Sequence, residues 1–343
     1  MFAGTGAVGR IGRPGLSAKH GASLLSGMTL ALDFMNDGVL DPRITFMRAS
    51  SATYTDASGI IQIAAINQPR WDYASGVLRG LLVEGPGTNL LLNSTTLVTQ
   101  SITVIAQAYT LSFYGTGTIT KSGAATGALV GTGVGQRVTQ TFTPTAGTLT
   151  CTVTGSVTNA QIEASSFVTS WIPTAGATAT REIDYAIMPI AGWYNQNAGT
   201  ALTTFTNRAW AGAAVLNNAL FVFDDGTSNN TIYQMAFANS NTFVQPNAAV
   251  VYLGTPANVS YNNLDIGGAP YTKAALAWAS GGTLRQAANG GVVSSVAMGN
   301  APVVSRLVFN GQLYGLVALN GHLRQFIYWN RALSDAELPQ VTT

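Results

Sequence analysis

The side chains best suited to hold a ligand are gathered in the polar loop at residues 224–230, which reads DDGTSNN. Its carboxylate and amide oxygens are of the kind that coordinates Ca²⁺ or accepts hydrogen bonds from sugar hydroxyls. A tryptophan in the stretch 193–197 offers an aromatic face that suits the C–H surface of a sugar. The candidate glycan-binding residues are Trp193, Asp225, Asn229 and Asn230, and the candidate Ca²⁺ ligands are Asp224 and Asp225.

Both segments also have simple structural interpretations, which stay open at this point. Asp and Asn are common turn formers, so the loop 224–230 is also typical of a hairpin turn between two strands. Trp193 is also suited to pack in a linker between two domains. Apart from the weak Ca²⁺ candidate, the sequence indicates no cofactor.

Catalytic arrangements are not indicated. The two histidines are His20, near the N-terminus, and His322, beside a predicted turn. A glycosidase needs two carboxylates that face each other at about 5 or 7–9 Å, but no Glu-x-Asp-x-x-Glu strand, typical of concanavalin-type glucanases, occurs. The Gly-rich stretch 4–9 follows no strand and therefore predicts no nucleotide site. We expect a protein that is not an enzyme. The acidic residues weighed in the C-terminal half are Asp224, Asp225, Asp265, Asp335 and Glu337.

Short runs in which apolar and polar residues alternate predict β-strands joined by Gly-rich turns, an all-β pattern typical of antiparallel sandwiches. Helix is favoured only at 334–338, where Ser334 and Glu337 match a capping box ended by Pro339, and at 17–25. Asn320-Gly321 predicts a hairpin turn. The expected strands include residues 109–114, 118–120, 137–142, 148–153, 220–223, 232–237, 249–252, 272–278 and 305–309.

Composition excludes several classes of function. Only 9% of the 343 residues are charged, against about a quarter in an average protein. The net charge of +2 does not indicate a basic surface that would bind nucleic acid. No apolar run reaches the roughly 18 residues of a membrane-inserted helix. The one cysteine, Cys151, lies in an alternating run, so we expect a buried structural thiol.

The N-terminal residues 1–27 predict an extended arm. Glycines interrupt its first half, so this part has little tendency to form a helix or a core. The arm either is disordered or becomes ordered on another subunit, with Arg10, Arg13 and Lys19 as candidate assembly residues. It lacks the apolar core of a secretion signal.

Four stretches resemble a module of bacteriophage virion proteins. They read TFMRAS at 45–50, ATYTDASG at 52–59, NQPRWDY at 67–73 and RGLLVEGPGTNLL at 79–91. Met47 and the Gly-Pro-Gly at 85–87 depart from the usual pattern of that family. The resemblance implies a tail or head fibre, or spike, whose lectin-like β domains follow this module.

Two later stretches resemble the ends of lectin-like domains. The pieces QIEA at 161–164, SWIPT at 170–174 and TR at 180–181 resemble the ending of small carbohydrate-binding jelly rolls in phage fibres. Residues 319–334, LNGHLRQFIYWNRALS, resemble the closing strand of concanavalin A-like, laminin-G-type domains. Trp171 either stacks on a sugar or packs at the edge of the first domain.

These observations together predict an all-β chain with two antiparallel β-sandwich (jelly-roll) domains. We expect an N-terminal arm at 1–27, an irregular β connector at 28–92, a small carbohydrate-binding-like sandwich at 93–186 and a concanavalin A-like sandwich at 187–343. The resemblance implies a virion structural protein, generally trimeric, that binds other virion proteins and host surface polysaccharide. The alternatives are a decoration or baseplate protein that uses these folds only for protein packing, and a secreted bacterial glycan-binding or glycan-cleaving protein.

Overall fold

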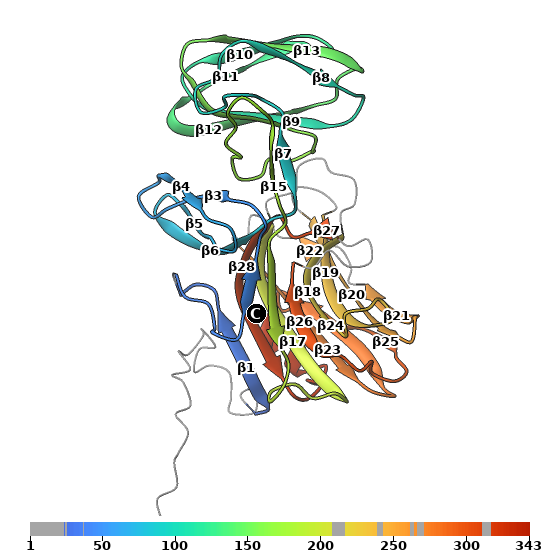
Figure 1. Cartoon of the computed structure of the whole chain (residues 1–343). Helices are drawn as coiled ribbons and strands as arrows, with labels where there is room; N and C mark the ends of the chain where they lie inside the picture. Colours follow the sequence, from blue (N-terminus) through green and yellow to red (C-terminus); the bar gives the residue numbers. More distant parts are fainter. Residues whose placement is uncertain are drawn as a thin grey trace, which may run out of the picture.

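The computed structural model describes residues 24, 26–36, 38–207, 217–238, 243–260, 264–265, 271–310 and 317–343. The candidate assembly residues Arg10, Arg13 and Lys19 lie outside this part, as does most of the helix predicted at 17–25. As predicted, the fold is all-β, and almost all strand pairs are antiparallel. Figure 1 shows a small sandwich at one end of the molecule and a larger one at the other.

The small sandwich contains a four-stranded and a three-stranded sheet with a common apolar core. Alternation places Leu111 and Phe113 of one sheet and Leu149 and Cys151 of the other in this core, each with no exposed surface. Cys151 is therefore the buried thiol that the sequence predicts. The sheets comprise β8 (Gln100–Val104), β10 (Thr118–Gly123), β11 (Gly127–Val130) and β13 (Gly147–Thr154), and β9 (Tyr109–Gly115), β12 (Gly133–Phe142) and β14 (Val157–Glu163).

The larger sandwich has an eight-stranded sheet and a nine-stranded sheet over the described residues. Aromatic side chains fill the space between them: Phe326 of the first sheet lies with its ring 5.4 Å from Phe221 and 5.1 Å from Phe309 of the second. The eight-stranded sheet contains β1 (Met28–Asp33), β5 (Trp71–Ala74), β6 (Val77–Val83), β17 (Ala198–Asn207), β23 (Thr272–Ala279), β24 (Thr283–Ala288), β25 (Ser294–Ala297) and β28 (Gly321–Trp329). The nine-stranded sheet contains β2 (Thr45–Met47), β16 (Tyr185–Pro189), β18 (Asn217–Asp224), β19 (Asn230–Ala238), β20 (Phe243–Tyr252), β21 (Thr255–Ser260), β22 (Leu264–Asp265), β26 (Arg306–Phe309) and β27 (Val317–Ala318).

The segment expected to be an irregular β connector, 28–92, supplies strands to both sheets of the larger sandwich. Strands β1 and β6 pair with β28, and β2 pairs with β16. The reason is burial, because Leu30, Leu81 and Val83 belong to the core between these sheets. The remaining strands of this segment are β3 (Ala52–Thr55) and β4 (Ile61–Ala64), which form a hairpin, and β7 (Gly87–Asn89), which pairs with β15 (Ala179–Arg181) below the small sandwich (Figure 1).

Two local predictions at the C-terminal end are wrong. Asn320-Gly321 does not close a hairpin, because β27 and β28 belong to different sheets, and the Asn320 side chain instead accepts a hydrogen bond from the Gly85 N–H. The helix does not stop at Pro339: α2 runs from Glu337 to Thr342. Proline is tolerated in a first helical turn because its missing N–H would have no partner there.

Candidate functional site

Three arginines and two carboxylates from segments far apart in the sequence, around residues 48, 70, 84 and 181–184, meet in the interior. Arg70 Nη2 lies 2.5 Å from Asp184 Oδ2, and its Nη1 lies 2.8 Å from Glu84 Oε2. Arg48 Nη1 is 2.9 Å from Asp184 Oδ1, and Arg181 Nη1 is 3.3 Å from Glu84 Oε2. All five side chains are at most 1% exposed. We call this group the buried ionic cluster.

The cluster connects parts of the fold that are far apart in sequence. Arg70 also donates to the Thr53 carbonyl of β3 and to the hydroxyl of Ser170, and Glu84 accepts from the Ser170 N–H. Burial disfavours the charge of Arg70, but the adjacent carboxylates outweigh it and raise its pKa. At Arg48 burial dominates and lowers the pKa. Because all five side chains are buried, we interpret the cluster as structural.

A hydroxyl, an imidazole and a carboxylate also lie in a row, but with the two ring nitrogens exchanged relative to a hydrolytic triad, in which the hydroxyl meets Nε2 and the carboxylate meets Nδ1. Thr206 Oγ1 lies 2.8 Å from His322 Nδ1, and His322 Nε2 lies 3.0 Å from Asp72 Oδ2. All three residues are buried, and Asp72 also accepts a hydrogen bond from the Thr55 N–H. We interpret these hydrogen bonds as structural contacts that hold β3 and β5 against β17 and β28.

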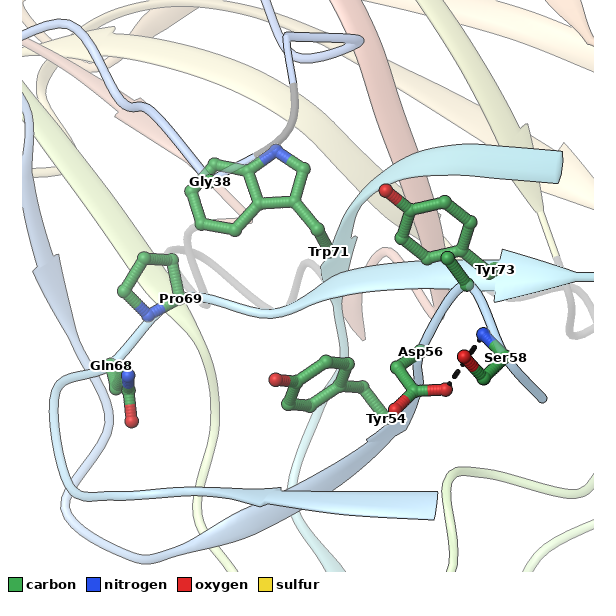
Figure 2. A pocket seen from close by; sticks show the side chains of 9 residues that line it. Gly38, Tyr54, Asp56, Ser58, Gln68, Pro69, Trp71 and Tyr73 are labelled. Atoms are coloured by element: carbon green, nitrogen blue, oxygen red, sulfur yellow. Dashed lines mark hydrogen bonds between the residues drawn. The ribbon is translucent and has the colours of Figure 1, made fainter. Parts of the chain in front are cut away.

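The surface beside β3 and β5 contains a pocket of about 510 Å³ with aromatic walls. Trp71 and Tyr73 alternate on β5 and face it, and Tyr54 of β3 faces it from the neighbouring strand (Figure 2). Trp71 is only 7% exposed and forms a rigid floor, whereas the two tyrosines are partly exposed. This volume and this mixture of aromatic and polar walls are typical of sites for small ligands.

The polar groups of the pocket come from a tight turn and a loop. Asp56 Oδ1 accepts hydrogen bonds of 2.9 Å from the N–H groups of Ser58 and Ile60, which fixes the turn after β3. Gln68 presents its amide from the loop before β5, next to Pro69 (Figure 2). Side-chain amides and carboxylates beside aromatic faces are the groups that orient sugar hydroxyls.

The structure rejects Trp193 as a ligand contact. It is 5% exposed and packs in the core of the larger sandwich, with its ring 5.0 Å from that of Tyr328. Its Nε1 donates to the Pro189 carbonyl at 3.0 Å. The sequence could not show this, because the packing partners come from distant strands. Trp171 is likewise buried, with its Nε1 3.3 Å from Ser94 Oγ, as the domain-edge interpretation predicts.

The loop 225–229 is exposed, but its polar groups bind one another. Asp225 accepts hydrogen bonds from Thr227 and, at 2.8 Å, from Asn230 Nδ2. Asp224 is buried and pairs with Arg306 at 2.5 Å, so it is not a free Ca²⁺ ligand. Among the described residues, no group of three acidic, His or Cys side chains is arranged to hold a metal ion. Asn229 is exposed, and glycan contact by Asp225, Asn229 and Asn230 stays a prediction.

The pocket was not predicted from the sequence, although the stretches 52–59 and 67–73 form most of its wall. The sequence feature that could have indicated the pocket is the spacing Trp71-x-Tyr73, which places two aromatic rings on one face of a strand. The approach of Tyr54 was not readable, because it depends on how β3 packs beside β5. Where the structure describes the chain, it contains no helix with the length and apolar character needed to cross a membrane.

No protein-family model matches the sequence, and no curated protein gives a significant match. Among solved structures, the carbohydrate-binding module (CBM40) of the Ruminococcus gnavus IT-sialidase bound to α2,3-sialyllactose is similar over 43% of this chain and 83% of that chain, with 14% identity and a TM-score of 0.33. The leech intramolecular trans-sialidase is similar over 43% of this chain and 23% of its own, with 14% identity and a TM-score of 0.32. The binding domain of botulinum neurotoxin serotype D/C is similar over 47% of this chain and 40% of its own, with 12% identity and a TM-score of 0.35.

Proposed function

We propose that this chain is a glycan-binding protein without catalytic activity, and that the pocket beside β3 and β5 is its binding site. The observation that carries the proposal is the grouping of Tyr54, Trp71 and Tyr73 around one pocket, with Asp56 and Gln68 at its wall. Rings of this kind contact the C–H faces of a sugar, and the polar groups accept or donate hydrogen bonds to its hydroxyls.

The setting that we propose is the surface of a bacteriophage particle, with host surface polysaccharide as the ligand. The support is the resemblance of residues 45–91 to a virion module, since two of its stretches, 52–59 and 67–73, supply most of the pocket wall. Mass spectrometry of purified particles tests this setting, and absence of the chain from them would contradict it.

Binding is tested with the full chain on a glycan array. Tyr54→Ala and Tyr73→Ala each remove an exposed aromatic wall, so each should weaken binding at least about tenfold, the loss of roughly 1.4 kcal/mol. Tyr252→Ala is the matched control, because Tyr252 is also a partly exposed strand tyrosine but lies on β20, outside the pocket. Equal binding by parent and pocket variants would contradict the proposal. Release of new reducing ends from a bound glycan would contradict the absence of catalysis.

A purely structural role in the particle is the second candidate, because the β3–β4 hairpin carries an exposed apolar surface. Ile60, Ile63 and Ile66 are 58%, 62% and 60% exposed. Within the described residues, β4 pairs only with β3, so its other edge is open to another strand. A homo-oligomer, which we propose to be a trimer, could cover this surface. Light scattering of Ile63→Ser beside the parent tests it, and an unchanged oligomer would argue against this surface as the interface.

A further inference from the structure

The charge of the pocket suggests which sugars it accepts. Of the nine described residues that line it, Asp56 is the one with a charged side chain, and none of the nine is Arg, Lys or His. The remaining walls are aromatic rings, a proline, small residues and the neutral amide of Gln68. Among these described residues, a sugar carboxylate in this pocket therefore meets a negative charge and no positive one.

The hydrogen bonds around its own turn favour the charged form of Asp56. The Gln62 side-chain amide donates to its Oδ2 at 2.7 Å, and the N–H groups of Ile60 and Ser58 donate to its Oδ1. These hydrogen bonds, led by that of Gln62, hold the pKa of the carboxyl below its usual range. Oδ1 is thus filled by two donors, whereas Oδ2 has one donor and keeps capacity for a second.

We propose that the pocket selects neutral and amino sugars and discriminates against anionic sugars such as uronic and sialic acids. This selectivity rests on the proposed glycan-binding function and narrows its substrate class. An amino sugar adds an ammonium group that can donate to the open position on Asp56 Oδ2. An anionic sugar adds a carboxylate that has no guanidinium or ammonium partner in the wall, and recognition of a carboxylate normally relies on such partners.

The size of the effect follows from the distance at which a bound sugar would lie from Asp56. At a separation of about 6 Å in a water-exposed pocket, repulsion between like charges weakens binding by about threefold. Attraction of an ammonium group strengthens binding by about the same factor. Both effects should shrink in 1 M salt, where the screening length falls to about 3 Å.

The experiment uses trisaccharides of the same linkage and length, from a galactose series and a glucose series. Each series is immobilised in three forms, as the neutral sugar, the 2-amino sugar and the uronic acid. Binding of the full chain to each form is measured at low and high salt. We expect amino sugars to bind most tightly, neutral sugars next and uronic acids least. In Asp56→Asn, which keeps a turn-forming side chain and removes the charge, the three affinities should converge.

The possible outcomes distinguish a failure of the proposed selectivity from a failure of the proposed glycan binding. Uronic acids that bind the parent as tightly as neutral sugars, or discrimination that persists in Asp56→Asn, would overturn the selectivity and leave the glycan-binding proposal standing. If none of the six trisaccharides binds and the array with the tyrosine variants is also negative, the binding proposal fails and the selectivity fails with it. Circular dichroism of Asp56→Asn serves as the folding control.

Discussion

Replacing Arg70 by alanine should destabilise the protein strongly without touching its surface. The guanidinium makes four hydrogen bonds in the buried ionic cluster, two of them to the carboxylates of Glu84 and Asp184. Alanine would leave these two buried carboxylates with less positive charge around them. Breaking a buried ion pair by removing one partner costs about 3–5 kcal/mol.

The remaining arginines place the expected loss near the middle of this range. Arg48 keeps its bond with Asp184, and Arg181 keeps its contact with Glu84, so neither carboxylate is left alone. We expect Arg70→Ala to lower the free energy of unfolding by about 4 kcal/mol. For a sandwich of this size, about 2–4 °C is lost per kcal/mol, so the Tm should fall by about 8–16 °C.

Thermal unfolding followed by circular dichroism measures this change. The matched control is Arg43→Ala, which removes an ion pair of similar length, 2.7 Å to Asp41, whose side chains are 45% and 22% exposed. An exposed pair contributes less than about 1 kcal/mol, so this variant should lose no more than a few degrees. A loss for Arg70→Ala that is as small as the loss for Arg43→Ala would refute the assignment of the cluster as a stabilising junction.

Three further predictions concern other parts of the fold. The hydrogen bond from Arg331, with the Ser334 N–H, lowers the pKa of Glu337 from 4.5 to about 2. The ionised carboxylate of Glu337 therefore stabilises the fold above pH 4.5, and this stabilisation is lost as the pH falls to about 2. The Tm difference between the parent and Glu337→Gln should disappear over that interval. A Tm difference that is constant with pH would contradict this prediction. Burial raises the pKa of the Cys151 thiol to about 11. The thiol should therefore not react with a thiol reagent at pH 8 until denaturant is added. Rapid labelling of the native chain would contradict this prediction, because it would show that the thiol is accessible. The double variant Asp225→Ala/Asn229→Ala should change the Tm by less than about 2 °C because the loop is exposed, and a loss of glycan binding in it would move the site from the pocket to this loop.

The strands could be predicted because each depends on its own residues. The strand-type residues at 109–114 and 272–278 predict strands, and the structure has β9 and β23 there, with both faces of each strand largely buried. The same logic placed Cys151 inside. It failed at Pro339 and at Asn320-Gly321, where the local signal fits several structures and the packing of the surrounding chain decides between them.

The candidate site was decided by tertiary structure. The sequence alone determined an all-β chain of low charge. It did not show that Arg48 would meet Asp184, 136 residues away, or that Tyr54 would stand beside Trp71 and Tyr73. Whether a charged or aromatic side chain is buried or exposed depends on which distant strands cover it, and that coverage exists only after the sheets have packed.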